Sequence, residues 1–145
     1  MGHQVEAYFR KGHGDHPVLV GTDEEMDALV DQLLAEPFAN SIAALYSLDR
    51  PLNPAGVPDH ELSLAVNAKA GVGGLRYQGD GVWFSHGAPS SRDEVFYLYM
   101  GNDTDFPHDS EIPIGLLRQA AKEFLNRGGE RPTCVTWQTD AGTSA

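Results

Sequence analysis

A series of short runs rich in β-branched and aromatic residues constrains the fold of this chain more than any other feature. Each run has the length and composition of a β-strand, and together they span residues 42–48, 61–68, 74–78, 82–85 and 95–100. The segments GVGG, at 71–74, and QGDG, at 78–81, carry the glycines that tight hairpin turns require. The runs from 61 to 85 are therefore expected to form an antiparallel meander.

Two amphipathic helices are predicted, one on each side of these runs. Thr22 and Glu25 form a capping box, and apolar residues then recur at helical spacing until Pro37. A second apolar stripe follows Pro113 and ends at a double glycine. Shorter strands are expected at 4–9, 18–20 and 133–137. This order predicts an α+β fold, in which a mostly antiparallel sheet carries two main helices on one face.

The chain has the length of one domain, which is expected to cover all of residues 1–145. The proline-rich segment 50–60 is interpreted as an irregular loop, because a linker would separate two sets of elements. No run approaches the roughly 18 apolar residues of a membrane span, and the first residues lack the apolar core of a signal peptide. The expected location is cytoplasmic.

The charge of the chain limits its partners. The 21 acidic and 10 basic residues give a formal net charge of −11, which repels phosphate backbones and anionic lipids. Neither a nucleic acid nor a membrane is therefore expected as a direct partner. A basic protein partner fits the charge, and simple solubility is the alternative explanation.

The sequence contains no recognisable catalytic or metal-binding pattern. His13 and His16 lie close together in a loop, but no second group of ligands appears at zinc-site spacing. Cys134 lies in an apolar run and is expected to act as a small buried hydrophobic residue. The glycine-rich turns do not match phosphate-binding loops, and no nucleophile is accompanied by a base. We therefore predict no enzyme activity, no cofactor and no metal.

The strongest binding feature is the segment 101–113, in which an aromatic residue lies among acids. Such a segment can present charge to a basic partner while the aromatic ring fills a pocket; the residues are Asp103, Asp105, Phe106, Asp109 and Glu111. A solvated connection between sheet and helix is the alternative. Trp83 is a further partner-binding candidate, with burial beneath the helices as its alternative.

Two residues near the end of the chain are expected to be structural. Trp137 is expected to pack in the core, and Arg131 to tie its turn to a nearby carboxylate.

The last third of the chain resembles the first immunity-protein family of bacterial polymorphic toxin systems. The resemblance rests on the order and spacing of YLYMGNDTDFP, IPIGLLRQAAKEFLNRGGERP and CVTWQ, with these matching positions: Tyr97, Tyr99, Gly101, Phe106, Pro107, Pro113, Ala121, Glu123, Phe124, Gly128, Arg131, Pro132, Val135 and Trp137. The first two thirds fit in length and strand pattern.

This resemblance implies a small cytosolic antitoxin encoded beside a toxin, often a nucleic-acid deaminase or a nuclease, which it binds and blocks. The expected partner is that cognate protein toxin, bound one to one by a monomer. Two other functions stay open on sequence grounds. One is a small enzyme or ligand-binding domain with a cleft between sheet and helices; the other is a module that self-assembles through an uncovered sheet edge.

Overall fold

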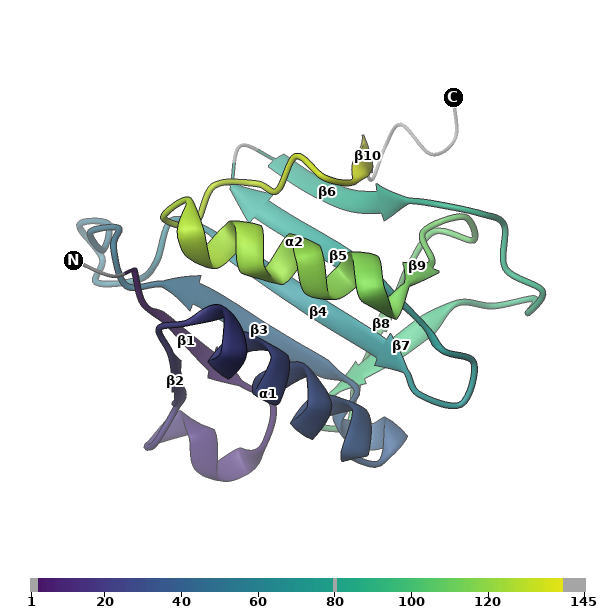
Figure 1. Cartoon of the computed structure of the whole chain (residues 1–145), viewed down its shortest axis with the longest axis horizontal. Helices are drawn as coiled ribbons and strands as arrows, with labels where there is room; N and C mark the ends of the chain where they lie inside the picture. Colours follow the sequence, from purple (N-terminus) through teal and green to yellow (C-terminus); the bar gives the residue numbers. More distant parts are fainter. Residues whose placement is uncertain (1–2, 80, 140–145) are drawn as a thin grey trace.

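A long, twisted antiparallel sheet forms the centre of the molecule (Figure 1). The computed structural model describes residues 3–79 and 81–139. The strands of the sheet follow the spatial order β10-β6-β5-β4-β3-β1-β2, and β9 pairs with part of β5. Their bounds are Val5–Tyr8 (β1), Val18–Val20 (β2), Ile42–Ser47 (β3), Glu61–Asn67 (β4), Val72–Gly79 (β5), Gly81–His86 (β6), Ile112–Pro113 (β9) and Thr136–Thr139 (β10). The predicted meander is confirmed as β4-β5-β6.

Both main helices cover the same face of this sheet, as predicted (Figure 1). Helix α1 spans Asp23–Ala35 and helix α2 spans Ile114–Asn126; short 3-10 helices cover Lys11–Gly14 (η1) and Phe38–Asn40 (η2). The apolar stripes of α1 and α2 enter the main core, where Leu29 and Leu117 are fully buried. The α+β class expected from the sequence is therefore confirmed.

The caps of the two helices follow from local sequence. The hydroxyl of Thr22 accepts a hydrogen bond from the Glu25 amide at 3.1 Å, and the Glu25 carboxylate accepts one from the Gly21 amide at 2.7 Å. The expected capping box is present, with its carboxylate shifted by one residue to Gly21. At the end of α2, Gly128 and Gly129 adopt φ values of 66° and 87°, a region that glycine enters without the steric cost of a Cβ.

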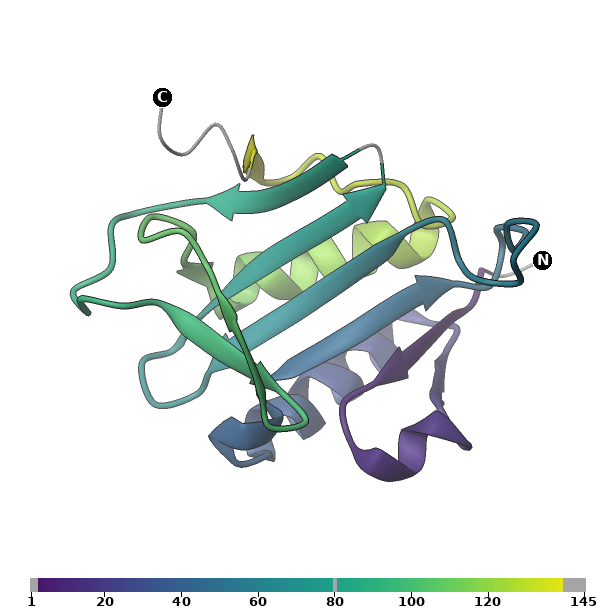
Figure 2. The same ribbon diagram turned by 180° about the vertical axis from the view of Figure 1, so that it is seen from behind.

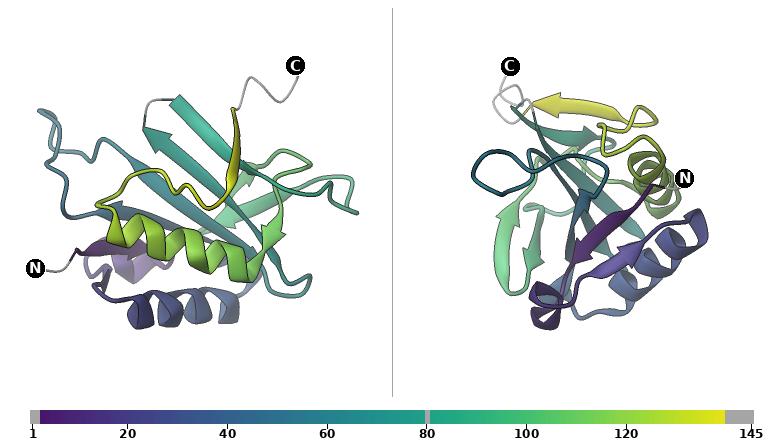
Figure 3. Two further views of the ribbon diagram at one scale, coloured as in Figure 1. Left: turned by 45° about the horizontal axis from the view of Figure 1, so that its top comes forward. Right: turned by 90° about the vertical axis from the view of Figure 1, so that its left-hand side faces the viewer.

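A β-hairpin covers the opposite face of the sheet. Strands β7, Phe96–Tyr99, and β8, Asn102–Asp105, pair only with each other and lie across the sheet on the side away from the helices (Figures 2 and 3). Strand β8 corrects the sequence prediction, which treated residues 101–113 as an irregular segment. A second core lies beneath the hairpin and consists of Ile42, Ala65, Phe84, Val95, Tyr97 and Phe106.

Two glycines in β5 lie where the layers approach most closely. The sequence placed Gly73 in a turn and Gly74 where that turn meets a strand, but Gly71, with φ of 72°, makes the turn and the other two glycines belong to the strand. A Cβ on Gly73 would lie 2.7 Å from Leu117 of α2, and one on Gly74 would lie 3.1 Å from the Phe106 ring. The missing side chains therefore let helix α2 and the second core reach β5 from opposite faces.

One edge of β5 is divided between two partners. Residues 76–79 pair with β6, whereas Val72 and Gly73 pair with β9. At the junction, the Leu75 amide donates to the Ser85 hydroxyl at 2.9 Å, and this hydroxyl donates to the Ser110 carbonyl at 2.7 Å. Ser85 thus satisfies the backbone groups at the point where β6 leaves the sheet.

We expect Gly73→Ala to lower the free energy of unfolding by about 1–3 kcal/mol, because overpacking a filled site strains the structure. Its Cβ would lie 2.3 Å from the Ala65 carbonyl oxygen. Gly115→Ala is the matched control, since a Cβ there meets nothing within 4 Å and alanine is the better helix former. Urea unfolding measures both variants; equal stability of the two would contradict the close packing at β5.

Candidate functional site

The β7–β8 hairpin divides the acidic segment between two faces. Neighbouring side chains of a strand point to opposite faces, and the register pairs Phe96 with Asp105 and Leu98 with Asp103. Asp103 and Asp105 are exposed on the outer face. Phe106 is only 6% exposed, and its ring packs edge to face on Phe84 and Tyr97, with centroids 5.1 Å away in each case. The expectation that Phe106 is an anchor for a partner is therefore wrong.

Two other phenylalanines supply exposed aromatic surface beside these acids. Phe96 of β7 is 37% exposed, and Phe38 of η2 is 41% exposed. Their rings meet edge to face at 5.8 Å. Both line a groove of about 470 Å³ between the end of α1, the β4–β5 turn and the hairpin, where Leu33, Leu34 and Val66 add apolar surface. Phe96 is thus the exposed aromatic residue beside Asp105, the role that was predicted for Phe106.

The carboxylates around these rings are not paired with any described cation. Asp93, Glu94, Asp103 and Asp105 are all exposed, and none forms an ion pair with another described residue. We call this surface, made of Phe38, Asp93, Glu94, Phe96, Asp103 and Asp105, the hairpin face. It combines apolar rings with uncompensated negative charge.

The remaining two acids of the predicted site bind groups within the chain. Asp109 accepts a hydrogen bond from the Gln138 amide at 2.9 Å, which lowers the pKa of Asp109, and its other oxygen lies 3.1 Å from His86. Glu111 pairs with Arg92 and accepts a 2.7 Å hydrogen bond from the Tyr97 hydroxyl. The structure thus places both acids at the junction between hairpin and sheet.

Trp83, Trp137 and Arg131 come together at the other end of the sheet. The Arg131 guanidinium carbon lies 4.0 Å from the Trp83 ring centre and 5.8 Å from that of Trp137. Both tryptophans are half-buried and pack against the main core, which agrees with the core position expected for Trp137. No described carboxylate lies within ion-pair distance of Arg131, so the predicted tie to a carboxylate is not found among the described residues. The guanidinium stacks on indole rings there.

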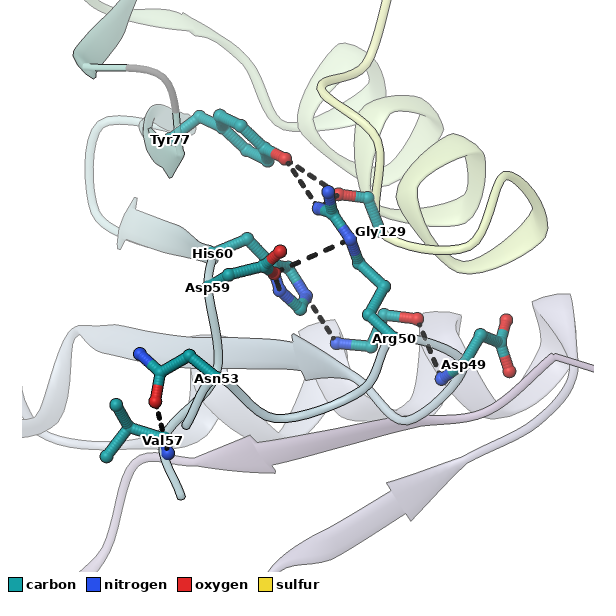
Figure 4. Close-up of polar contacts among 9 residues, drawn as sticks. Asp49, Arg50, Asn53, Val57, Asp59, His60, Tyr77 and Gly129 are labelled. Atoms are coloured by element: carbon teal, nitrogen blue, oxygen red, sulfur yellow. Dashed lines mark hydrogen bonds and ion pairs between the residues drawn. The ribbon is translucent and has the colours of Figure 1, made fainter. Parts of the chain in front are cut away.

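Arg50 makes the tie that the sequence analysis assigned to Arg131 (Figure 4). Its guanidinium donates to the Gly129 carbonyl at 3.1 Å and to the Tyr77 hydroxyl at 3.3 Å, and lies 3.6 Å from Asp59. Arg50 thereby joins the loop after β3 to the turn after α2. The only sequence signal for this role was the position of Arg50 at the start of the proline-rich loop.

His60 closes the same loop from inside the molecule (Figure 4). Its side chain is 1% exposed, and its Nε2 accepts a hydrogen bond from the Ser47 amide at 2.8 Å, while Nδ1 lies 3.0 Å from Asp59. Accepting at Nε2 and donating from Nδ1 requires the neutral ring. Burial lowers the pKa of His60, aided by Arg50 and opposed by Asp59 and Glu61.

Glu123 holds the segment that follows α2. Its carboxylate accepts hydrogen bonds from the Thr133 amide and hydroxyl, both at 2.7 Å, and from the Cys134 amide at 3.0 Å, and pairs with Arg127 at 2.9 Å. Burial opposes the charge, but these contacts outweigh it and lower the pKa of Glu123 to about 2. The EF motif of the sequence is therefore an anchor for the chain leading to β10.

Within residues 3–79 and 81–139, no group of His, Cys, Asp and Glu side chains is arranged to hold a metal ion. Burial raises the pKa of the half-buried Cys134 thiol to about 11, and the neighbouring Glu123 acts in the same direction, which keeps the thiol protonated. No helix in this part of the chain is long and apolar enough to cross a membrane.

We expect the free energy of unfolding to fall as the pH drops below about 6.5. His60 then binds a proton in the unfolded chain, but it stays neutral in the folded chain because its pKa is lowered there. Thermal unfolding from pH 8 to pH 5 should show a steeper loss for the wild type than for His60→Gln. Equal slopes for the two proteins would contradict a neutral, buried His60.

Replacing Glu123 by glutamine should lower the free energy of unfolding by about 1–3 kcal/mol, because the charge-assisted hydrogen bonds to the Thr133 and Cys134 amides are lost. Glu130→Gln is the control, since this exposed carboxylate only lies 3.7 Å from Arg127 and surface pairs contribute little. Urea unfolding at pH 7 compares the two. A loss at Glu130 as large as that at Glu123 would contradict the anchoring role.

Comparison with known proteins identifies the family of this chain. The model of the family described as immunity protein Imm1 matches residues 14–139, which include both helices, the hairpin and all the site residues described above. A search of curated proteins finds no match. Because the family model covers most of the chain, this protein belongs to the Imm1 family of immunity proteins.

Proposed function

We propose that this protein neutralises a cognate toxin by binding it through the hairpin face and covering its active site. Membership of an immunity-protein family implies a protein toxin as partner. The observation that carries the choice of surface is the pair of exposed phenylalanines, Phe38 and Phe96, beside carboxylates without cations. Neutralisation is steric occlusion without turnover, in a one-to-one complex.

The aromatic pair supports tight contact. A phenylalanine ring that is already held against a neighbouring ring loses little conformational freedom when a partner covers it. Such rings near the centre of an interface carry a large share of the binding energy. The groove beside Phe38 and Phe96 has room for an apolar side chain of the toxin.

The carboxylates support recognition of a basic partner. A toxin that acts on a nucleic acid, such as a deaminase or a nuclease, must present a basic cleft to phosphate groups. With a net charge of −11, the immunity protein attracts such a cleft and accelerates association. Asp103 and Asp105 then occupy positions that the nucleic acid would otherwise take. A small-ligand site between sheet and helices gains no support, because apolar core residues fill that space.

Coexpression with the toxin encoded by the adjacent gene tests this function. We expect a stable complex and rescued growth of the producing cells. Absence of both complex and rescue would overturn the proposal. A monomer in solution without the toxin, measured by mass, is the expected resting state, and a stable self-assembled form would favour the alternative of sheet-edge assembly.

Within the complex, Asp103→Asn combined with Asp105→Asn should slow association and flatten its salt dependence, because steering by these charges is lost. Phe96→Ala should instead accelerate dissociation, with a loss of affinity of roughly 10-fold or more. Stopped-flow or surface-plasmon measurements at low and high salt separate the two effects.

The matched control is Asp23→Asn with Glu24→Gln, which removes the same charge from the start of α1, on the other side of the sheet. Its on-rate should fall less than that of the hairpin double variant. Equal on-rates for both double variants would mean that only net charge matters, and that the hairpin face is not the contact.

A further inference from the structure

A second recess, far from the hairpin face along the sheet, gathers positive charge in this acidic protein. It has a volume of about 900 Å³ and lies between the loop before β4, the β5–β6 hairpin and the chain that links α2 to β10. Arginine and aromatic side chains dominate its lining, which includes Arg50, Arg127, Arg131, Tyr77, Trp83 and Trp137. We call it the arginine recess.

The charges of the recess cancel except at one residue. Arg50 lies 3.6 Å from Asp59, and Arg127 pairs with Glu123 at 2.9 Å and with Glu130 at 3.7 Å. Arg131 has no carboxylate within ion-pair distance among the residues that the structure describes. The recess therefore carries one guanidinium charge that no described carboxylate compensates.

The stacking of Arg131 leaves its hydrogen-bond donors available. The guanidinium carbon lies 4.0 Å from the centre of the Trp83 ring, so the cation contacts indole through its flat face. The N–H donors of an arginine lie in the plane of the group, around its rim. No hydrogen bond joins Arg131 to another described residue. The N–H groups along one edge of its guanidinium can therefore donate to an acceptor with two oxygens.

We propose that the arginine recess binds a carboxylate group, supplied by an aspartate or glutamate side chain of the toxin. This inference rests on the proposed function and adds a second contact to it. A carboxylate matches the guanidinium fork with two parallel hydrogen bonds. A phosphate dianion fits less well, because Asp59 and Glu130 also line the recess and repel a second negative charge.

The composition of the recess is that of an interface hot spot. Tryptophan, tyrosine and arginine are the residues whose truncation most often weakens protein complexes. The net charge of −11 disfavours contact of an acidic toxin residue with much of the remaining surface. A recess that carries an uncompensated guanidinium therefore helps to orient the toxin when its basic cleft meets the hairpin face.

The first experiment measures the complex of the toxin with Arg131→Gln, a side chain of similar reach without charge. We expect a loss of affinity of roughly 10-fold to 100-fold, mainly through faster dissociation, and a smaller loss for Arg131→Lys. Lys11→Gln is the control, because it removes the same charge from an exposed site and should change affinity less than about 2-fold. Thermal unfolding verifies that each variant is folded; unchanged affinity in folded Arg131→Gln overturns the inference.

The second experiment uses the full chain without the toxin. The probe is the capped peptide acetyl-Gly-Glu-Gly-amide, with the glutamine peptide and inorganic phosphate as comparisons, and the readout is the ¹H–¹⁵N signals of the Arg131 and Trp83 side chains. We expect saturable shifts, with Kd roughly millimolar, for the glutamate peptide, and none in Arg131→Gln. No saturable shift, or an equal response to phosphate, overturns the carboxylate assignment.

The two experiments separate the failure of this inference from the failure of the proposed function. If the chain binds no toxin but the glutamate peptide still shifts Arg131, the proposed function is wrong and the carboxylate site stands. If the toxin binds wild type and Arg131→Gln equally well, the proposed function stands and the toxin contact at Arg131 is wrong.

Discussion

The structure depends on the close approach of two layers to the middle of strand β5. Helix α2 comes within contact of Gly73, and the ring of Phe106 lies over Gly74 on the other side. Because both positions lack a Cβ, a single layer of backbone separates the main core from the second core. Strand β5 is thus covered on both faces at this point, and helix α2 and the hairpin are positioned by the same strand. The proposed recognition surface on the hairpin is therefore supported directly by the central frame.

Local signals in the sequence predicted most of the helices and strands. They could not predict which side chains of the hairpin face the sheet and which face outward. Thr22 and Glu25 specify where α1 begins, and glycines specify where α2 ends, because caps act through the nearest backbone groups. Residues 95–100 are apolar almost throughout, so periodicity does not reveal which side faces the sheet. The register places Tyr97 and Phe106 inward and Phe96 outward. Phe106 was predicted to point outward but points toward the sheet. Only the position of the sheet beneath the hairpin determines which of the two phenylalanines is exposed.

Tertiary contacts also decide which charges face a partner. Asp109 and Glu111 are as acidic in sequence as Asp103 and Asp105, yet Gln138 and Arg92 bind the first two from distant positions. Arg50 and Arg131 show the converse: Arg50 is held by the turn after α2, and Arg131 lies on indole rings. Net charge follows from composition alone. Which charged side chains remain available to a partner depends on ion pairs and hydrogen bonds between residues that are far apart along the chain. The Imm1 membership identifies the class of partner, and these pairs are the reason for proposing the hairpin face as the surface that this partner contacts.

The hairpin leaves the sheet and returns to it at almost the same place. Gly87 donates to the Asp109 carbonyl at 2.7 Å, Ala88 bridges Glu111, and β9 resumes pairing on the strand whose edge β6 has just left. The ends of this excursion are fixed by backbone contacts at its base, and its outer carboxylates, Asp103 and Asp105, form no ion pair with another described residue. Surface segments closed in this way tolerate sequence change well. Substitutions on the outer side of the excursion should therefore leave the rest of the frame intact, so that the same frame can present a different surface to a different toxin.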